Sequence, residues 1–124
     1  MNLPLKVAPP RPARGDVFSA RLDPVEGSEQ AGTRPVVVVS RDSINANSPV
    51  VVVVPVTDAS NLKRAYPSHA FLPKGSGGLK LDSVAKTEQI RAVQVSRFVG
   101  YCGRLDTDAV ARIEEAIKIT LALR

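Results

Sequence analysis

The chain has 124 residues, of which 44% are hydrophobic and 23% are charged. This length and composition predict one compact globular domain and argue against a disordered or collagen-like chain. The net charge is +5, but three of the seventeen basic residues precede the first acidic one, which leaves 14 basic and 12 acidic side chains in residues 15–124. A uniformly basic coat for nucleic acid is therefore not supported, and a local basic groove is the alternative.

Residues 1–13 are rich in proline and carry no hydrophobic period, so we expect a flexible leader there and a single domain over residues 14–124. The leader lacks the apolar core of a secretory signal, and the longest apolar run, residues 50–56, is far shorter than a membrane span. We therefore expect a cytoplasmic protein without membrane contact. One cysteine, Cys102, and one histidine, His69, cannot form a zinc site within one chain, and no metal or cofactor is expected.

Short runs of β-branched residues dominate the middle of the chain. Residues 35–40 and 50–57 are each predicted to form a buried strand, and their continuous valines predict that both faces of these strands are covered. Weaker patterns predict further strands at 16–22, 68–72, 83–91 and 97–101. Residues 24–32 are expected to be a polar loop and residues 74–80 a tight turn.

The chain is predicted to close with a helix that starts at Asp106 or Thr107 as the N-cap. The apolar residues of one helix face recur at spacings of 3, 4 and 4, namely Val110, Ile113, Ile117 and Leu121. Ile119 and Leu123 form a second apolar strip, which we expect a partner to cover. Five or six short strands and one C-terminal helix predict a mainly β fold, either a bent antiparallel sheet or a small barrel.

Polar side chains next to the predicted strands are candidates for chemistry. Arg34 stands at the entrance of the first valine strand, and Thr57 ends the second. Lys86 and Glu88 are two residues apart on an expected strand and would therefore point to the same side. The pattern alone favours plainer interpretations, which are a structural ion pair for Arg34, a solvated strand face for Lys86 and Glu88, and a structural role for His69.

Short segments follow one family signature in order and spacing. The first are RGDV (14–17), DP (23–24), GSEQ (27–30) and GTRPV (32–36). They continue with PVT (55–57), PSH (67–69), DSV (82–84), EQIR (88–91) and TLAL (120–123). In these segments, and over roughly residues 14–123, the chain resembles the MazF/PemK family of toxin endoribonucleases.

The resemblance implies a small SH3-like barrel with a C-terminal helix, the MazF/CcdB-type toxin fold, in a homodimer whose shared groove binds single-stranded RNA. It also implies a sequence-specific, metal-independent endoribonuclease (mRNA interferase) of a toxin–antitoxin system, with a cognate antitoxin protein as partner. In such enzymes a ribose 2′-hydroxyl attacks the adjacent phosphate and leaves 2′,3′-cyclic phosphate and 5′-hydroxyl ends.

By this resemblance the catalytic residues are Arg34 and Thr57. The residues expected to hold RNA are Arg14, Ser28, Glu29, Gln30, Ser83 and Gln89. The PemK branch assigns acid and base roles to an Arg and an Asp two residues apart, and this chain has Lys86 and Glu88 there, so these two are the candidates for proton transfer. With few aromatic residues in the chain, Phe18 near the first loop is the candidate for base stacking.

A non-catalytic relative that binds RNA or protein is the alternative function. One such relative is a CcdB-like gyrase poison, but those proteins depend on a C-terminal Trp and this chain contains no Trp. The other is a module that only binds RNA or sequesters antitoxin.

Overall fold

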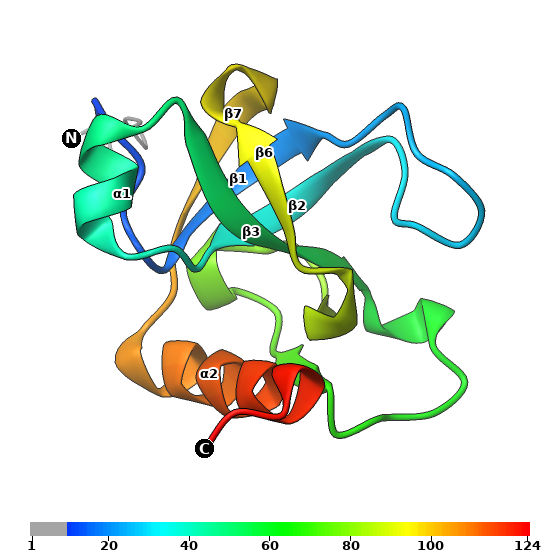
Figure 1. Cartoon of the computed structure of the whole chain (residues 1–124). Coiled ribbons are helices and arrows are strands. Elements are labelled where there is room, and N and C mark those ends of the chain that lie inside the picture. The colour runs from blue at the N-terminus through cyan, green and yellow to red at the C-terminus, as the bar shows by residue number, and fades with distance from the viewer. Residues whose placement is uncertain (1–9) are drawn as a thin grey trace, which may run out of the picture.

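The computed structural model describes residues 10–124 (Figure 1). In that range the strands are β1 (Asp16–Arg21), β2 (Thr33–Val38), β3 (Val50–Asp58), β4 (His69–Leu72), β5 (Ser83–Lys86), β6 (Arg91–Gln94) and β7 (Phe98–Arg104). The helices are α1 (Asp42–Asn47) and α2 (Thr107–Leu121). Four single 3₁₀ turns complete the list: η1 (Ala59–Asn61), η2 (Ser76–Gly78), η3 (Thr87–Gln89) and η4 (Val95–Arg97).

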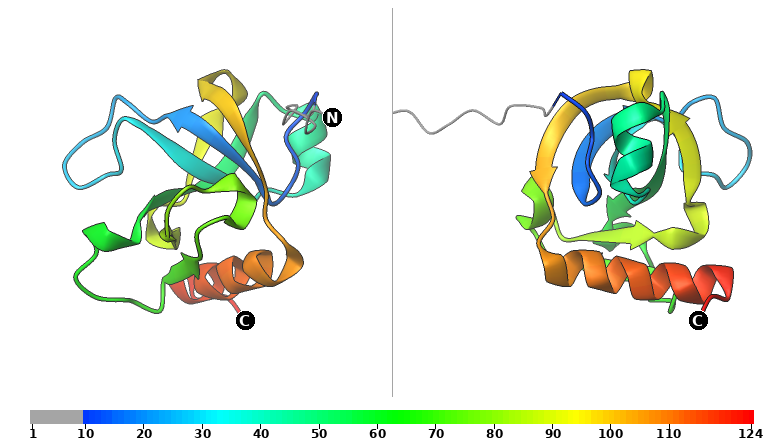
Figure 2. Two further views of the ribbon diagram at one scale, coloured as in Figure 1. Left: turned by 180° about the vertical axis from the view of Figure 1, so that it is seen from behind. Right: turned by 60° about the vertical axis from the view of Figure 1, so that its left-hand side comes forward.

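All strand pairs are antiparallel, and the sheet runs β4-β5-β3-β2-β1-β7. The long strand β3 has two partners on one side, because Val50–Val53 pair with β6 and Val56–Asp58 pair with β5. Pro55, which has no N–H to donate, lies where β3 changes partner. The sheet therefore bends round on itself, and α2 packs across one side of it (Figure 2). The predicted mainly β fold with a C-terminal helix is confirmed.

Two hydrophobic cores lie on opposite faces of the bent sheet. Even and odd positions of a strand point to opposite faces. On β3, Val54 and Val56 join the core under α2 together with Ile113, whereas Val51 and Val53 join the core enclosed by the barrel strands. The prediction that both faces of the valine strands are covered is thus confirmed, and both strands that carry the candidate site are held on both faces.

The predicted strand at 83–91 is wrong in its middle, because β5 ends at Lys86 and η3 separates it from β6. The cause is Thr87, a fully buried residue whose hydroxyl contacts the Ser68 carbonyl, the Ala116 carbonyl at 3.3 Å and the Thr120 hydroxyl at 2.7 Å. These bonds draw the chain towards α2 and away from strand geometry. The periodicity of the sequence contains no sign of them.

The C-terminal helix begins as predicted, since the Asp106 side chain accepts a hydrogen bond of 2.8 Å from the Ala109 N–H. Its buried face agrees with the prediction at Ile113, and Val110 and Ile117 are partly buried against the same core, but Leu121 departs from it. The side chains below 4% exposure are Ala109, Ile113 and Ala116, while Leu121 is 49% exposed. Small alanines let the helix approach the sheet closely, and a pattern based on large apolar residues does not count them. Neither helix in residues 10–124 is long and apolar enough to cross a bilayer.

Residues 1–9 of the predicted leader lie outside the described residues. Its last four residues, 10–13, are described and make specific contacts. Arg11 Nε donates to the Asn45 carbonyl at 2.8 Å, Pro12 is buried, and the Ala13 N–H donates to Asp16 Oδ2 at 2.8 Å. The packed part of the chain therefore begins before residue 14.

The predicted turn at 74–80 folds tightly against the barrel. Gly77 is buried with φ at 54°, and a Cβ there would lie 2.6 Å from Val17 Cγ2. Gly103 in β7 faces the turn from the other side, since a Cβ on Gly103 would lie 2.9 Å from the Gly77 carbonyl carbon. Two glycines thus allow the turn to pack on β7, and the packed turn carries Leu79, Lys80 and Leu81 to the rim of the sheet.

Candidate functional site

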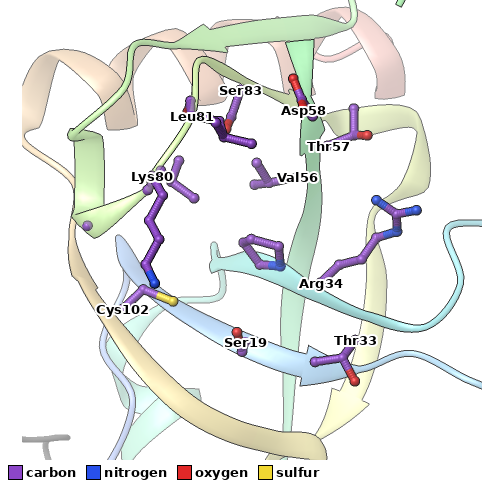
Figure 3. Close-up of a pocket in the computed structure, with 13 residues that line it drawn as sticks. Ser19, Thr33, Arg34, Val56, Thr57, Asp58, Lys80, Leu81, Ser83 and Cys102 are labelled. Carbon is purple, nitrogen blue, oxygen red and sulfur yellow. The ribbon is translucent and has the colours of Figure 1, made fainter. Parts of the chain in front are cut away.

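A pocket of about 380 Å³ opens where β2 begins and β3 ends, and the segment after η2 forms its other wall (Figure 3). The polar residues among those that line it include Arg34, Thr57, Asp58, Lys80 and Ser83. Three residues predicted for the site from sequence, Arg34, Thr57 and Ser83, are therefore brought together.

Arg34 and Thr57 face each other across two core strands. The β2–β3 pairing ends with Val36 opposite Pro55; Arg34 and Thr57 each lie two residues beyond that pair, on the same side of it, and both line the pocket. Residues opposite each other in an antiparallel pair have their side chains on the same face. The guanidinium and the hydroxyl accordingly lie on the same side of β3 (Figure 3).

The Arg34 guanidinium has no carboxylate partner within 4.0 Å among residues 10–124. Within these residues its one hydrogen bond runs from Nε to the Ala31 carbonyl at 2.9 Å, which orients the half-buried side chain and leaves both terminal nitrogens available. The structural ion pair that the pattern favoured is therefore wrong in the described part of the chain. A fixed guanidinium with two unused nitrogens is suited to a bidentate contact with an anion such as phosphate.

Thr57 is only 5% exposed, and its Oγ1 accepts from Asn61 Nδ2 at 3.4 Å. Ser83 is 4% exposed and donates from Oγ to the Leu81 carbonyl at 2.7 Å. Both hydroxyls are thus held by neighbouring residues.

Lys80 lines the same pocket, and the sequence did not single it out. Its exposed side chain runs along the wall across from Arg34 towards Cys102 (Figure 3). The only signal in the sequence is a cation directly after a glycine-rich turn. Two cationic side chains on opposite walls outweigh the one carboxylate of the pocket, Asp58, and this net positive charge favours a ligand with negative charge.

A second cavity of about 230 Å³ lies between the 24–32 loop and η3, and Pro55 of β3 is among its lining residues. It brings together Gln30 and Gln89, because the Gln30 N–H donates to Gln89 Oε1 at 3.3 Å. The Gln30 side-chain oxygen is buried and has no hydrogen-bond partner in residues 10–124. Glu29 also lines this cavity, and its carboxylate accepts from the Glu26 N–H at 2.7 Å; Ser28 is exposed on the same loop.

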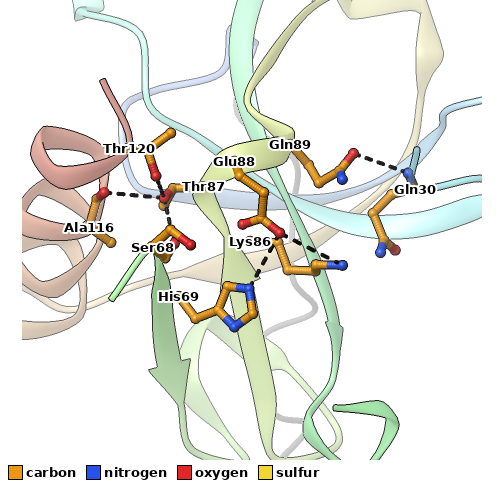
Figure 4. Close-up of polar contacts among 9 residues, drawn as sticks. All are labelled: Gln30, Ser68, His69, Lys86, Thr87, Glu88, Gln89, Ala116 and Thr120. Atoms are coloured by element: carbon orange, nitrogen blue, oxygen red, sulfur yellow. Dashed lines mark hydrogen bonds and ion pairs between the residues drawn. The ribbon is translucent and has the colours of Figure 1, made fainter. Parts of the chain in front are cut away.

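Lys86 and Glu88 contact each other, although they do not share a strand. Lys86 ends β5, and η3 turns the chain so that Lys86 Nζ lies 3.9 Å from Glu88 Oε2. The same oxygen lies 3.3 Å from His69 Nε2 (Figure 4). A solvated strand face, the interpretation that the pattern favoured, is therefore wrong for this pair. Glu88 lines the second cavity.

Two residues predicted to contact RNA lie apart from both cavities. Arg14 donates from Nε to the Val39 carbonyl at 3.1 Å and pairs with Glu114 at 2.6 Å. Val39 follows the far end of β2, about 16 Å along the strand from Arg34 at roughly 3.3 Å per residue. Arg14 is therefore distant from the pocket of its own protomer.

Phe18 is inside the barrel and only 6% exposed. Its ring stacks on Phe98 with centroids 4.5 Å apart and also contacts Tyr101. The ring is therefore mostly enclosed by the barrel, and its remaining exposed edge lines a third pocket with Phe98 and Tyr101. A base-stacking role for Phe18 stays a prediction.

Two titratable groups elsewhere have shifted pKa values. The Arg14 N–H and the Asn45 side chain hydrogen-bond to Asp42 and lower the pKa of that carboxyl. Burial raises the pKa of the Tyr101 hydroxyl. Among residues 10–124 no three His, Cys, Asp or Glu side chains gather as ligands for a metal.

Comparison with known proteins supplies the family. A family model described as "PemK-like, MazF-like toxin of type II toxin-antitoxin system" matches residues 13–121. Endoribonuclease MazF9 of Mycobacterium tuberculosis is 39% identical over 115 residues, which are 89% of this chain and 96% of that protein. Endoribonuclease EndoA of Bacillus subtilis is 40% identical over 110 residues, which are 89% of this chain and 94% of that protein.

Solved structures share the fold. MazF from Deinococcus radiodurans superposes with a TM-score of 0.77 at 24% identity, covering 91% of this chain and 98% of that one. An endoribonuclease from a mycobacterial species, solved in complex with its cognate antitoxin, gives 0.75 at 21% identity and covers 91% of this chain and 97% of that one.

Proposed function

The chain belongs to the family of PemK-like, MazF-like toxins of type II toxin–antitoxin systems and is an endoribonuclease, and from this premise we propose that it cleaves single-stranded RNA without a metal ion. In the proposed reaction a ribose 2′-oxygen attacks the adjacent phosphorus, and the bond from phosphorus to the 5′-oxygen breaks. The products carry a 2′,3′-cyclic phosphate and a 5′-hydroxyl.

The observation that supports this proposal most is the Arg34–Thr57 pair. The nucleophile belongs to the substrate, so the protein has to align the phosphate and stabilise the charge that builds on its oxygens. Arg34 has two unused terminal nitrogens for the non-bridging oxygens, and Thr57 has a buried hydroxyl on the same face. Both donors come from strands packed on two sides, so little reorganisation is needed during the reaction.

Two protons have to move in this reaction, and we assign them to the cluster on η3. Arginine has a pKa above about 12 and is a poor base, so the proton of the 2′-hydroxyl needs another acceptor. The proposed acceptor is the Glu88 carboxylate, which lines the second cavity. Lys86, whose side chain is 16% exposed, is the proposed donor to the leaving 5′-oxygen.

The flanking nucleotides are proposed to occupy the second cavity and the loop beside it. The residues proposed to hold RNA there and in the first pocket are Ser28, Glu29, Gln30, Ser83 and Gln89. Arg14 remains a proposed RNA contact, and its distance from the pocket means that it would contact a nucleotide other than the scissile one.

The assembly that we propose is a homodimer inhibited by an antitoxin. Ile119 in α2 is 57% exposed, and Leu123, just after the helix, is 58% exposed. These side chains leave apolar surface for a second copy of the chain. An acidic antitoxin segment would occupy the cationic pocket in place of phosphate. The proposed functional unit is the single domain over residues 14–124, extended by the packed residues 11–13. If saturating cognate antitoxin left cleavage unchanged, competition at the pocket would be refuted.

The direct test is to incubate the protein with a long RNA of known sequence in EDTA and to map both ends of every product. The proposal predicts cleavage at defined sites, with 2′,3′-cyclic phosphate and 5′-hydroxyl ends. Loss of cleavage in EDTA that Mg²⁺ restores would contradict metal independence, and 3′-hydroxyl or 5′-phosphate ends would contradict attack by the 2′-oxygen.

A further inference from the structure

His69 is the one histidine of the chain, and neither the family resemblance nor the proposed reaction gives it a role. It begins β4 and lies opposite Lys86 of β5 in the strand register. Its side chain is only 7% exposed, and Nε2 lies 3.3 Å from Glu88 Oε2. The histidine is therefore a buried neighbour of the carboxylate proposed to accept the proton.

His69 supplies the only hydrogen bond to the Glu88 carboxylate within residues 10–124. Lys86 Nζ lies 3.9 Å from the same oxygen, which is close enough for an ion pair but too far for a hydrogen bond. Glu88 is 38% exposed and lies on a turn of three residues, so its side chain would otherwise adopt several rotamers. A directional bond from a buried ring selects one of them.

The imidazole ring has a further contact besides the Glu88 carboxylate. The Tyr66 ring meets it edge-on, with centroids 5.2 Å apart and planes at 81°. The preceding residue, Ser68, accepts from the Thr87 N–H at 3.2 Å, which ties the start of β4 to η3. His69 and Glu88 are thus carried by two segments that are bonded to each other.

This geometry also defines the tautomer and the free oxygen. If Nε2 donates to the carboxylate, neutral His69 has no hydrogen on Nδ1, and that nitrogen is buried without a partner in the described chain. Both partners of Glu88 contact Oε2, so Oε1 carries no hydrogen bond from residues 10–124. Oε1 is therefore the oxygen available to a substrate.

We propose that His69 is a positioning residue, which holds Oε2 of Glu88 so that Oε1 can accept the proton of the attacking 2′-hydroxyl. The inference rests on the proposed function, because it requires Glu88 to be the proton acceptor. His69 itself does not touch the substrate in this scheme. Its effect is on the rate of cleavage and not on RNA affinity.

The test replaces His69 in two backgrounds, the parental chain and Glu88→Gln, and measures kcat and KM with a short RNA substrate. His69→Leu removes the donor, whereas His69→Gln places an amide N–H close to the position of Nε2. We expect His69→Leu to lower kcat about 10-fold with KM unchanged within about 2-fold, since small misplacement of a reacting group is costly. We expect His69→Gln to recover most of that loss.

In the Glu88→Gln background, neither substitution of His69 should lower kcat further, because the group that His69 positions is already absent. An equal loss in both backgrounds, or a rise in KM alone, would overturn the positioning role and leave the Glu88 assignment intact. Thermal melts check folding, and His69→Asn, whose amide is too short to reach Glu88, replaces His69→Leu if that variant is unfolded.

The remaining outcomes separate this inference from the proposed function. If Glu88→Gln cleaves at the parental rate while Arg34→Ala is inactive, the positioning role is overturned and the phosphate contacts stand. If Arg34→Ala also cleaves at the parental rate, the proposed reaction itself is wrong.

Discussion

Replacement of Arg34 by alanine tests the proposed reaction most directly. In the part of the chain that the structure describes, the side chain has one hydrogen bond, from Nε to the Ala31 carbonyl at 2.9 Å, so its removal costs the fold only about 0.5–1.5 kcal/mol. Its two terminal nitrogens are free for the transition state, and loss of a single preorganised donor lowers a rate about 100- to 1000-fold. With up to two donors lost, we expect Arg34→Ala to reduce cleavage by at least about 1000-fold, or about 4 kcal/mol.

The assay is single-turnover cleavage of an RNA substrate at enzyme excess, with thermal melting and sedimentation of each variant. Arg34→Lys keeps the charge and loses the planar fork, and it should recover little activity if the contact is bidentate. Thr57→Ala removes one donor and should lower the rate about 100-fold. Arg112→Ala, on the exposed side of α2, is the matched control and should cleave normally. A folded Arg34→Ala variant with a rate within about 10-fold of the parent would refute this reasoning.

Three further predictions concern the fold and the assembly. Gly77→Ala should lower the free energy of unfolding by about 2–4 kcal/mol in urea titrations, because the added methyl would lie 2.6 Å from Val17 Cγ2 at a positive φ; Gly100→Ala, where a Cβ meets nothing within 4 Å, should have little effect. Since the pKa of Asp42 is lowered, its contribution to stability is present above the usual carboxyl value of 3.8 and is lost as pH falls through the lowered folded value. The stability difference between the parent and Asp42→Asn should therefore shrink between pH 6 and acid, and a constant difference would contradict the assigned hydrogen bonds. Ile119→Asp should shift sedimentation towards monomer while Lys118→Ala does not, and a parental protein that is already monomeric at micromolar concentration would refute the dimer.

The sequence predicted best those features that depend on long apolar runs. Continuous valines in β2 and β3 required burial on both faces, and the two cores supply it. The same strands brought Arg34 and Thr57 together, because antiparallel register places the start of one strand beside the end of the next.

The failures arose where a single contact overrides the local pattern. The bonds of Thr87 to α2 connect residues far apart in the sequence, so nothing near position 87 indicates that a strand ends there. Lys80 enters the pocket only because Gly77 and Gly103 allow a close approach of two backbones.

Because β3 contributes side chains to both hydrophobic cores, it links the motions of the site to those of the whole fold. Val51 and Val53 belong to one core and Val54 and Val56 to the other, while Thr57 follows immediately. Neither half of the molecule can open without exposing part of this strand, so the two cores form one cooperative unit and not two separate foldons. The amide hydrogens of β3 should then exchange with solvent only through global unfolding, and they should do so together. Glu88 and Gln89 lie on a three-residue turn that is joined to α2 and to the start of β4 through Thr87. The pair proposed to contact phosphate would therefore share the lifetime of the whole fold, and the turn beside it would open only when the contacts of Thr87 break.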